Sequence, residues 1–151
     1  MATFLDSYIN KLEKAKNNVE SDVLSLLIDN ESEIRAMIKQ RWLLGKRTDG
    51  DIIGVYSDSD YSNGYAEQKN RMNPKAGYGN VDLVLSGDLV GRIKTVLENK
   101  KIEIISTDDK FEDILENYGA DNFNITEEEE TELLDGIMVE VVTNIFNEVW
   151  G

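Results

Sequence analysis

Histidine and cysteine, the side chains that most often carry out catalysis or bind transition metals, are both absent from this sequence of 151 residues. Their absence excludes Ser-His-Asp hydrolysis, Cys-His chemistry, disulfides and the usual zinc sites. The sequence does contain 30 Asp and Glu residues. Scattered carboxylates of this kind could pair as a general acid and base, but nothing in their spacing selects a pair.

The stretch Asp58 to Gly64 superficially resembles a calcium-binding loop. An EF-hand requires glycine at position 6 and a bidentate glutamate at position 12 of the loop. Counted from Asp58, these positions hold Asn63 and Lys69. The spacing therefore does not predict a calcium site.

Two further patterns also fall short of a site. Glu127 to Glu130 are consecutive, and consecutive residues of a helix point in different directions, so favourable contact with the helix dipole accounts for them. Ser86-Gly87-Asp88 has one glycine and no following lysine, unlike a phosphate-binding loop. The sequence thus predicts no catalytic, cofactor-binding or metal-binding residue, and an enzyme is only the weaker hypothesis.

Apolar residues at helical spacing predict an amphipathic helix over residues 4–28 and a second helix over 31–40. The Asp49-Gly50 pair predicts a hairpin in which residues 41–44 pair with 52–56. Residues 57–80 then form a long loop with one helical turn near 65–71. Loops of this length are uncommon without a function, so we expect an interface arm here.

Residues 81–125 are expected to form the centre of the fold. Alternating apolar residues predict strands over 81–86, 89–97 and 102–106, with Gly91 as a bulge. A short helix follows over 108–118 and ends at a left-handed Gly119. Trp42 and Trp150 are interpreted as core or subunit-contact aromatics.

The last helix has the clearest start signal, a capping box formed by Thr126 and Glu129. Its apolar stripe is wide enough to be buried on two sides, by the sheet and by a neighbouring subunit: Leu133, Leu134, Ile137, Met138, Val141, Val142, Ile145, Phe146 and Val149. The whole chain is thus predicted to be one α+β domain over 1–151, helical over 1–40, mainly β over 41–106 and helical over 107–151. In it, a small antiparallel sheet of about four strands carries the short helix and the long C-terminal helix.

The net charge of −14 comes from the last third of the chain, where residues 103–151 hold one basic residue against fifteen acidic ones. Such a surface repels phosphate backbones, so specific nucleic-acid binding is not expected. It serves solubility, or it faces a basic partner or a channel that DNA passes without binding. No apolar run approaches the roughly 18 residues of a membrane span, and the N-terminus resembles no targeting signal, so we expect folding in a cytoplasm.

Several short motifs together resemble the tail-completion and neck proteins of tailed bacteriophages, including those of crAss-like phages of gut bacteria. They are Tyr65 to Lys69, Val81-Asp82-Leu83 followed by Leu85-Ser86-Gly87-Asp88-Leu89, Ile102 to Ser106, and Tyr118-Gly119. Leu44-Gly45 and Asp49-Gly50 before Tyr56 also match, so the likeness covers about residues 41–125. Two positions depart from the pattern: Ser86 stands where threonine is common, and the basic residues that follow are reduced to Arg92 and Lys94.

This resemblance implies a virion protein without enzymatic activity, assembled in the host cytoplasm. Copies would form a six- or twelvefold ring in the neck between portal and tail, with other neck and tail proteins as partners and DNA at most passing through the lumen. The competing hypothesis is an acidic cytoplasmic adaptor, or an inhibitor that mimics nucleic acid. The candidate contact residues are Tyr61, Tyr65, Lys69, Arg71, Pro74, Tyr78, Gly87, Arg92, Tyr118, Gly119, Phe123 and Trp150.

Overall fold

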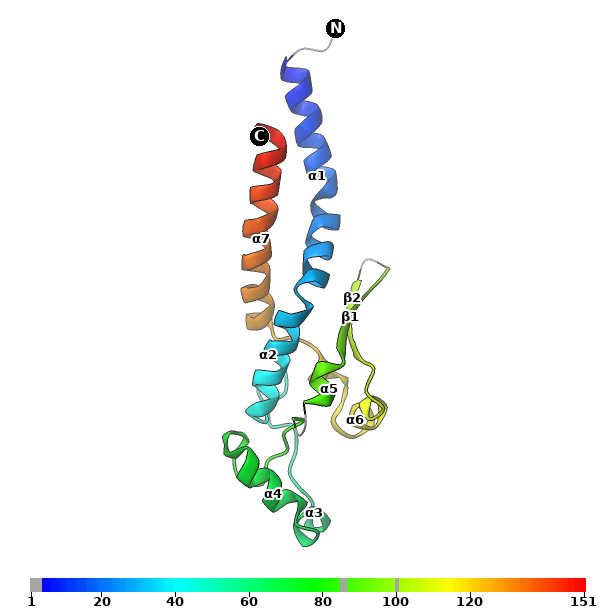
Figure 1. Ribbon diagram of the computed structural model, residues 1–151, viewed down its shortest axis with the longest axis vertical. Coiled ribbons are helices and arrows are strands. Elements are labelled where there is room, and N and C mark those ends of the chain that lie inside the picture. Colours follow the sequence, from blue (N-terminus) through cyan, green and yellow to red (C-terminus); the bar gives the residue numbers. More distant parts are fainter. Residues whose placement is uncertain (1–3, 85–86, 100) are drawn as a thin grey trace.

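The computed structural model describes residues 4–84, 87–99 and 101–151, and it has both helices and strands. Two long helices, α1 (Phe4–Asp29) and α7 (Glu127–Trp150), lie side by side and form one end of an elongated molecule (Figure 1). The other elements gather at the opposite end. In chain order they are α2 (Glu31–Leu43), α3 (Asp58–Ser62), α4 (Tyr65–Met72), η1 (Pro74–Ala76), α5 (Asp88–Gly91), β1 (Ile93–Glu98), β2 (Lys101–Ser106), α6 (Phe111–Tyr118) and η2 (Ala120–Phe123).

The sheet is smaller than the sequence predicts. Among the described residues it has two antiparallel strands, β1 and β2, paired from Ile93↔Ser106 to Glu98↔Lys101. Asn99 turns between them with a φ of 49°. The prediction of about four strands was therefore wrong in number, although the α+β class is confirmed.

The other predicted strands fail for local reasons. Residues 41–43 continue α2, and only the single bridge Lys46↔Ile52 closes the turn at Asp49-Gly50. Val55 instead forms a single bridge with Asn80. Residues 81–84 form no strand, and 85–86 lie outside the described residues. Gly87 has a φ of 84° and starts the helical turn α5, which buries the adjacent residues Leu89 and Val90 together and includes Gly91.

The segment 57–80 is more ordered than a loop with one helical turn. It holds α3, α4 and η1, of which α4 contains the predicted turn. A capping box at Ser57 and Asp60 starts α3. We call residues 57–80 the arm; in Figure 1 its helices α3 and α4 lie at the end of the molecule opposite the chain termini.

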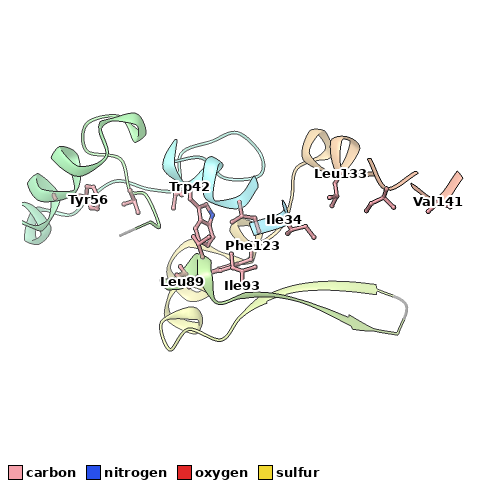
Figure 2. Close-up of a cluster of buried hydrophobic side chains, with 14 residues drawn as sticks. Ile34, Trp42, Tyr56, Leu89, Ile93, Phe123, Leu133 and Val141 are labelled. Atoms are coloured by element: carbon pink, nitrogen blue, oxygen red, sulfur yellow. The ribbon is translucent and has the colours of Figure 1, made fainter. Parts of the chain in front are cut away.

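The main core lies where α2, α5, β1 and η2 meet (Figure 2). Trp42 is fully buried there, with its ring edge-on to Phe123 at a centroid distance of 5.3 Å. Leu133, Ile137 and Val141 extend the core along α7. The predicted packing of α7 on the sheet is not its main contact: α7 packs chiefly along α1, and β1 packs on α1 and α2.

Candidate partner-binding surfaces

A buried ion pair fixes the arm to the rest of the molecule. The Nζ of Lys69, on α4, lies 2.5 Å from Oδ1 of Asp82 and donates to the carbonyl of Val84 at 2.8 Å. Asn73 donates to the second carboxylate oxygen of Asp82 at 3.1 Å and to the carbonyl of Leu43 at 2.8 Å. Because every one of these bonds joins the arm to residues outside it, the arm has a defined position relative to α2.

The outer surface of the arm carries exposed aromatic, apolar and basic side chains. Tyr78 is 73% exposed, and its hydroxyl donates to Glu67 at 2.7 Å. That bond raises the pKa of the Tyr78 phenol. The ring centroids of Tyr61 and Tyr78 lie 6.2 Å apart, and Arg71 and Pro74 are also exposed on the arm. This surface can offer stacking and charge to a partner.

A cavity of about 380 Å³ lies between the arm and α6. Three tyrosines line it, and burial raises the pKa of each phenol: Tyr56, Tyr65 and Tyr118. Asp60, Asp108 and Asp109 are among its acidic residues. A wall of aromatic faces with carboxylates at hand suits a cationic side chain better than an anion.

A second buried ion pair joins α2 to the start of α7. The guanidinium of Arg41 pairs with the carboxylate of Glu129 and also donates to the carbonyls of Asn122 (3.1 Å) and Asn124 (2.5 Å). The indole of Trp42 donates to the same Asn122 carbonyl at 3.0 Å. Glu129 also accepts from the backbone N–H of Thr126 at 2.7 Å, so one carboxylate both caps α7 and anchors it.

The free ends of α1 and α7 form the tip of the helical pair. Tyr8 meets Trp150 at a ring-centroid distance of 5.0 Å, and Lys14 lies 3.6 Å from Glu148. Trp150 is nevertheless 63% exposed. Further apolar residues at the tip are exposed on both helices, including Leu5, Leu12, Val142 and Phe146.

The predicted contact residues are divided among these places rather than forming one patch. Lys69 and Phe123 are buried, so neither is available to a partner in this structure. The arm carries Tyr61, Tyr65, Arg71, Pro74 and Tyr78, and the tip carries Trp150. Gly87 and Tyr118 line the cavity, Gly119 follows Tyr118, and the exposed Arg92 reaches Asp108 at 3.6 Å.

Two of these positions depend on glycine. Gly119 has a φ of 84° and a ψ of 156°, a conformation that favours glycine but is not the predicted left-handed helical cap. Gly87 is left-handed and starts α5. Both glycines therefore allow backbone conformations next to the cavity that other residues rarely adopt. A role in partner contact would be additional to this backbone role.

Sequence reasoning missed two important groups. Residues 41–44 fit either the last turn of the second helix or the start of a strand, and the expected hairpin placed Arg41 in a strand; it lies in α2 instead, one helical turn beyond Met37 and Ile38. The helical spacing of Leu5, Ile9 and Leu12 predicted that they belong to the buried stripe of the first helix, but all three are exposed. Spacing alone does not show how much of such a stripe a neighbouring helix covers.

Of the acidic patterns weighed from the sequence, none forms a metal-binding group of three or more ligands within residues 4–84, 87–99 and 101–151. Asp58 to Ser62 form α3 instead of a calcium loop. Of the four consecutive glutamates, Glu129 forms an ion pair with Arg41, and the other three are exposed. Glu127 and Glu128 line an open surface depression together with Lys46 and Arg47. In the described part of the chain, no helix has the length and hydropathy needed to cross a membrane.

Comparison of the chain with protein-family models, with curated proteins and with solved structures finds no match.

Proposed function

We propose that this chain is a structural protein of a tailed-bacteriophage virion, located in the neck, where copies form a ring that joins the portal to the tail. It acts by protein–protein contact and has no enzymatic activity. It is assembled in the host cytoplasm, and DNA passes through the ring without specific binding.

The observation that carries the proposal is that residues of several separate motifs line the same cavity. Several of the segments that resemble neck and tail-completion proteins, separated by up to about fifty residues, contribute to one cavity, whereas Ile102 to Ser106 form β2 and do not line it. Tyr65 and Lys69, Val81 to Leu83, Gly87 to Leu89 and Tyr118 line it. The Lys69–Asp82 pair joins the first two segments directly. These motifs are thus parts of one structural unit, and a contact surface is built around it.

The shape of the molecule gives further support. The arm and the tip lie at opposite ends of an elongated chain and both expose apolar side chains, among them Tyr78 and Trp150. A subunit of a ring needs separate surfaces for neighbouring copies and for the proteins above and below. Two anchored projections on one core provide such surfaces.

The acidic surface is consistent with a lumen or a basic partner. Residues 103–151 hold fifteen of the 30 acidic residues and one basic residue. A surface of this sign lets DNA pass because it offers no cations to replace phosphate counterions. The same surface would serve a nucleic-acid mimic, which is why the experiment must separate the two.

The test is to purify the phage particles that encode the chain and to detect it by mass spectrometry. We expect it in stoichiometric amounts, in six or twelve copies, and in a ring next to the portal in a cryo-electron microscopy map. Absence from purified particles would refute the proposal. Capture of a basic nucleic-acid enzyme from infected cells, with no chain in the virion, would favour the mimic.

A further inference from the structure

The two helices of the tip share an exposed apolar face that their mutual packing leaves uncovered. On α7, Val141, Ile145 and Val149 follow one another at steps of four residues and lie toward α1, with Val141 and Val149 fully buried. Val142, Phe146 and Trp150 follow each of these by one residue and are 59%, 61% and 63% exposed. They form a second stripe about a quarter turn from the first.

The exposed residues of α1 lie on the same side of the pair. Ala15 is buried against α7, and Lys14, one residue before it, is paired with Glu148, so these two charges mark one side. Successive helical residues are about 100° apart, which places Leu5, Ile9 and Leu12 on the side opposite Lys14. These three side chains are 66%, 44% and 49% exposed. Both helices therefore present apolar residues to the same side; we call this surface the tip face.

We propose that the tip face binds the tip face of a second copy of this chain, so that two helical pairs form a four-helix bundle. A helix with two apolar stripes a quarter turn apart requires two neighbours, and each helix of a four-helix bundle has two. One neighbour is already present in each chain. A second antiparallel helical pair of equal length would supply the other.

The area of the tip face is suitable for a stable pair. Its six exposed side chains, including one Phe and one Trp, offer on the order of 600 Å² before flanking residues are counted, against about 800 Å² per partner in interfaces of standard size. Phe146 and Trp150 lie 6.3 Å apart and would be the central anchors. Aromatic residues are enriched at such positions.

The distribution of charge favours a second copy over other occupants. The chain as a whole carries −14, yet residues 4–16 and 136–151 hold three lysines against four carboxylates, a net charge of −1. Two copies therefore meet little charge repulsion at the tip, unlike over residues 103–135, where acidic residues predominate. A lipid surface is disfavoured, because helices that lie on membranes present lysine and arginine along the polar face.

The pairing goes beyond the proposed function. A neck ring needs only head-to-tail contacts, whereas this contact joins identical faces about a twofold axis. It is therefore tested on the purified chain alone, where the outcome does not depend on whether the protein occurs in virions.

The experiment compares two substitutions on α7 by sedimentation velocity. Val142→Glu places a charge in the tip face, whereas Asn144→Glu adds the same charge at an exposed position about 160° away around the helix. We expect the unmodified chain and Asn144→Glu to sediment as pairs of the 17.1 kDa chain. Val142→Glu should weaken the pairing at least tenfold, with circular dichroism unchanged.

Cysteine crosslinking gives a second measurement on the full chain, which has no cysteine of its own. A bismaleimide should join two copies of Val142→Cys into a dimer and should leave Asn144→Cys, on the opposite side of α7, largely monomeric. A monomeric unmodified chain at high micromolar concentration would overturn the proposal. Equal weakening by both glutamates, or equal crosslinking of both cysteines, would also overturn it.

Discussion

The Lys69–Asp82 pair is the most deeply buried charge interaction among the described residues, with side chains 2% and 1% exposed. Burial of two charges is unfavourable unless their hydrogen bonds are satisfied. Here Val84 and Asn73 supply the additional partners. The pair therefore fixes where the arm lies and adds less to stability than its short distance suggests.

We predict that Lys69→Met destabilises the protein by about 3–5 kcal/mol, because it leaves the carboxylate of Asp82 buried without its cation. Urea denaturation followed by circular dichroism measures the change. Lys75→Met is the matched control, since Lys75 is exposed in the same arm, and it should change the free energy of unfolding by less than about 0.5 kcal/mol. Equal effects of the two substitutions would contradict the structural role of the pair.

Glu31 provides a pH-dependent contact between α2 and β1. Its carboxylate accepts from the backbone N–H of Thr95 at 2.7 Å and from the Thr95 hydroxyl at 3.1 Å. The backbone bond is the main cause that lowers the pKa of Glu31. Because the folded pKa lies below the unfolded one, the contribution is complete above the unfolded pKa. It is lost as the pH falls through the folded pKa.

We accordingly expect Glu31→Gln to lower the free energy of unfolding by about 1 kcal/mol at neutral pH and by much less at an acidic pH below the folded pKa of Glu31. Denaturant titrations at the two pH values measure the difference. The exposed Glu33, in the same helical turn, gives the control substitution Glu33→Gln. A pH-independent effect of Glu31→Gln would show that its charge is not what matters.

At the level of single residues, the sequence predicted local contacts well and distant ones poorly. The bonds between Thr126 and Glu129 join residues three apart, so their pattern was readable. The pairing of Arg41 with Glu129 joins residues 88 apart in sequence and left no local pattern. Trp42 and Trp150 were assigned to core or contact without distinction, since either outcome depends on the tertiary neighbours.

Of all the elements, helix α7 has the clearest start signal in its local sequence. Thr126 accepts from the N–H of Glu129 at 3.1 Å, and Glu129 accepts in return from Thr126. Four glutamates in the first turn are also favourable to the helix dipole. The observed helix therefore starts where the sequence predicts it.

The two members of this capping box should differ in their contribution. Thr126→Ala removes one cap and should lower the free energy of unfolding by about 1 kcal/mol. Glu129→Ala removes the other cap and also leaves Arg41, which is 6% exposed, without its counter-charge, so we expect about 3 kcal/mol. Chemical denaturation of both variants makes the comparison. Equal losses of unfolding free energy in the two variants would mean that the ion pair between Arg41 and Glu129 does not stabilise the fold.

The strands show where prediction from sequence fails at the level of elements. The periodic helices α1, α2 and α7 were predicted within a few residues because each stripe is long. The short apolar runs at 41–44, 52–56 and 89–92 were read as strands, but such runs fit a helical turn or an extended loop equally well. The positive φ of Gly87 and the continuation of α2 decided between them.

The whole molecule combines a compact base with a projecting helical pair (Figure 1). The sequence patterns predicted the α+β class but not this shape, because the stripe of α7 was expected to lie on a sheet. A two-stranded hairpin is too small to cover a helix of 24 residues. The uncovered part of the stripe is what the inferred pairing would bury.

The two tryptophans lie in different parts of the molecule, Trp42 fully buried in the base and Trp150 at the tip, 63% exposed in the single chain. The protein therefore carries two intrinsic optical reporters with different access to solvent. Iodide should quench the red-shifted emission of Trp150 in unpaired chains, and pairing of the tip faces should protect it, whereas the emission of Trp42 should stay almost untouched in both states. Events at the tip and unfolding of the base can thus be followed separately in one unlabelled sample, with Trp150→Phe to assign the signals.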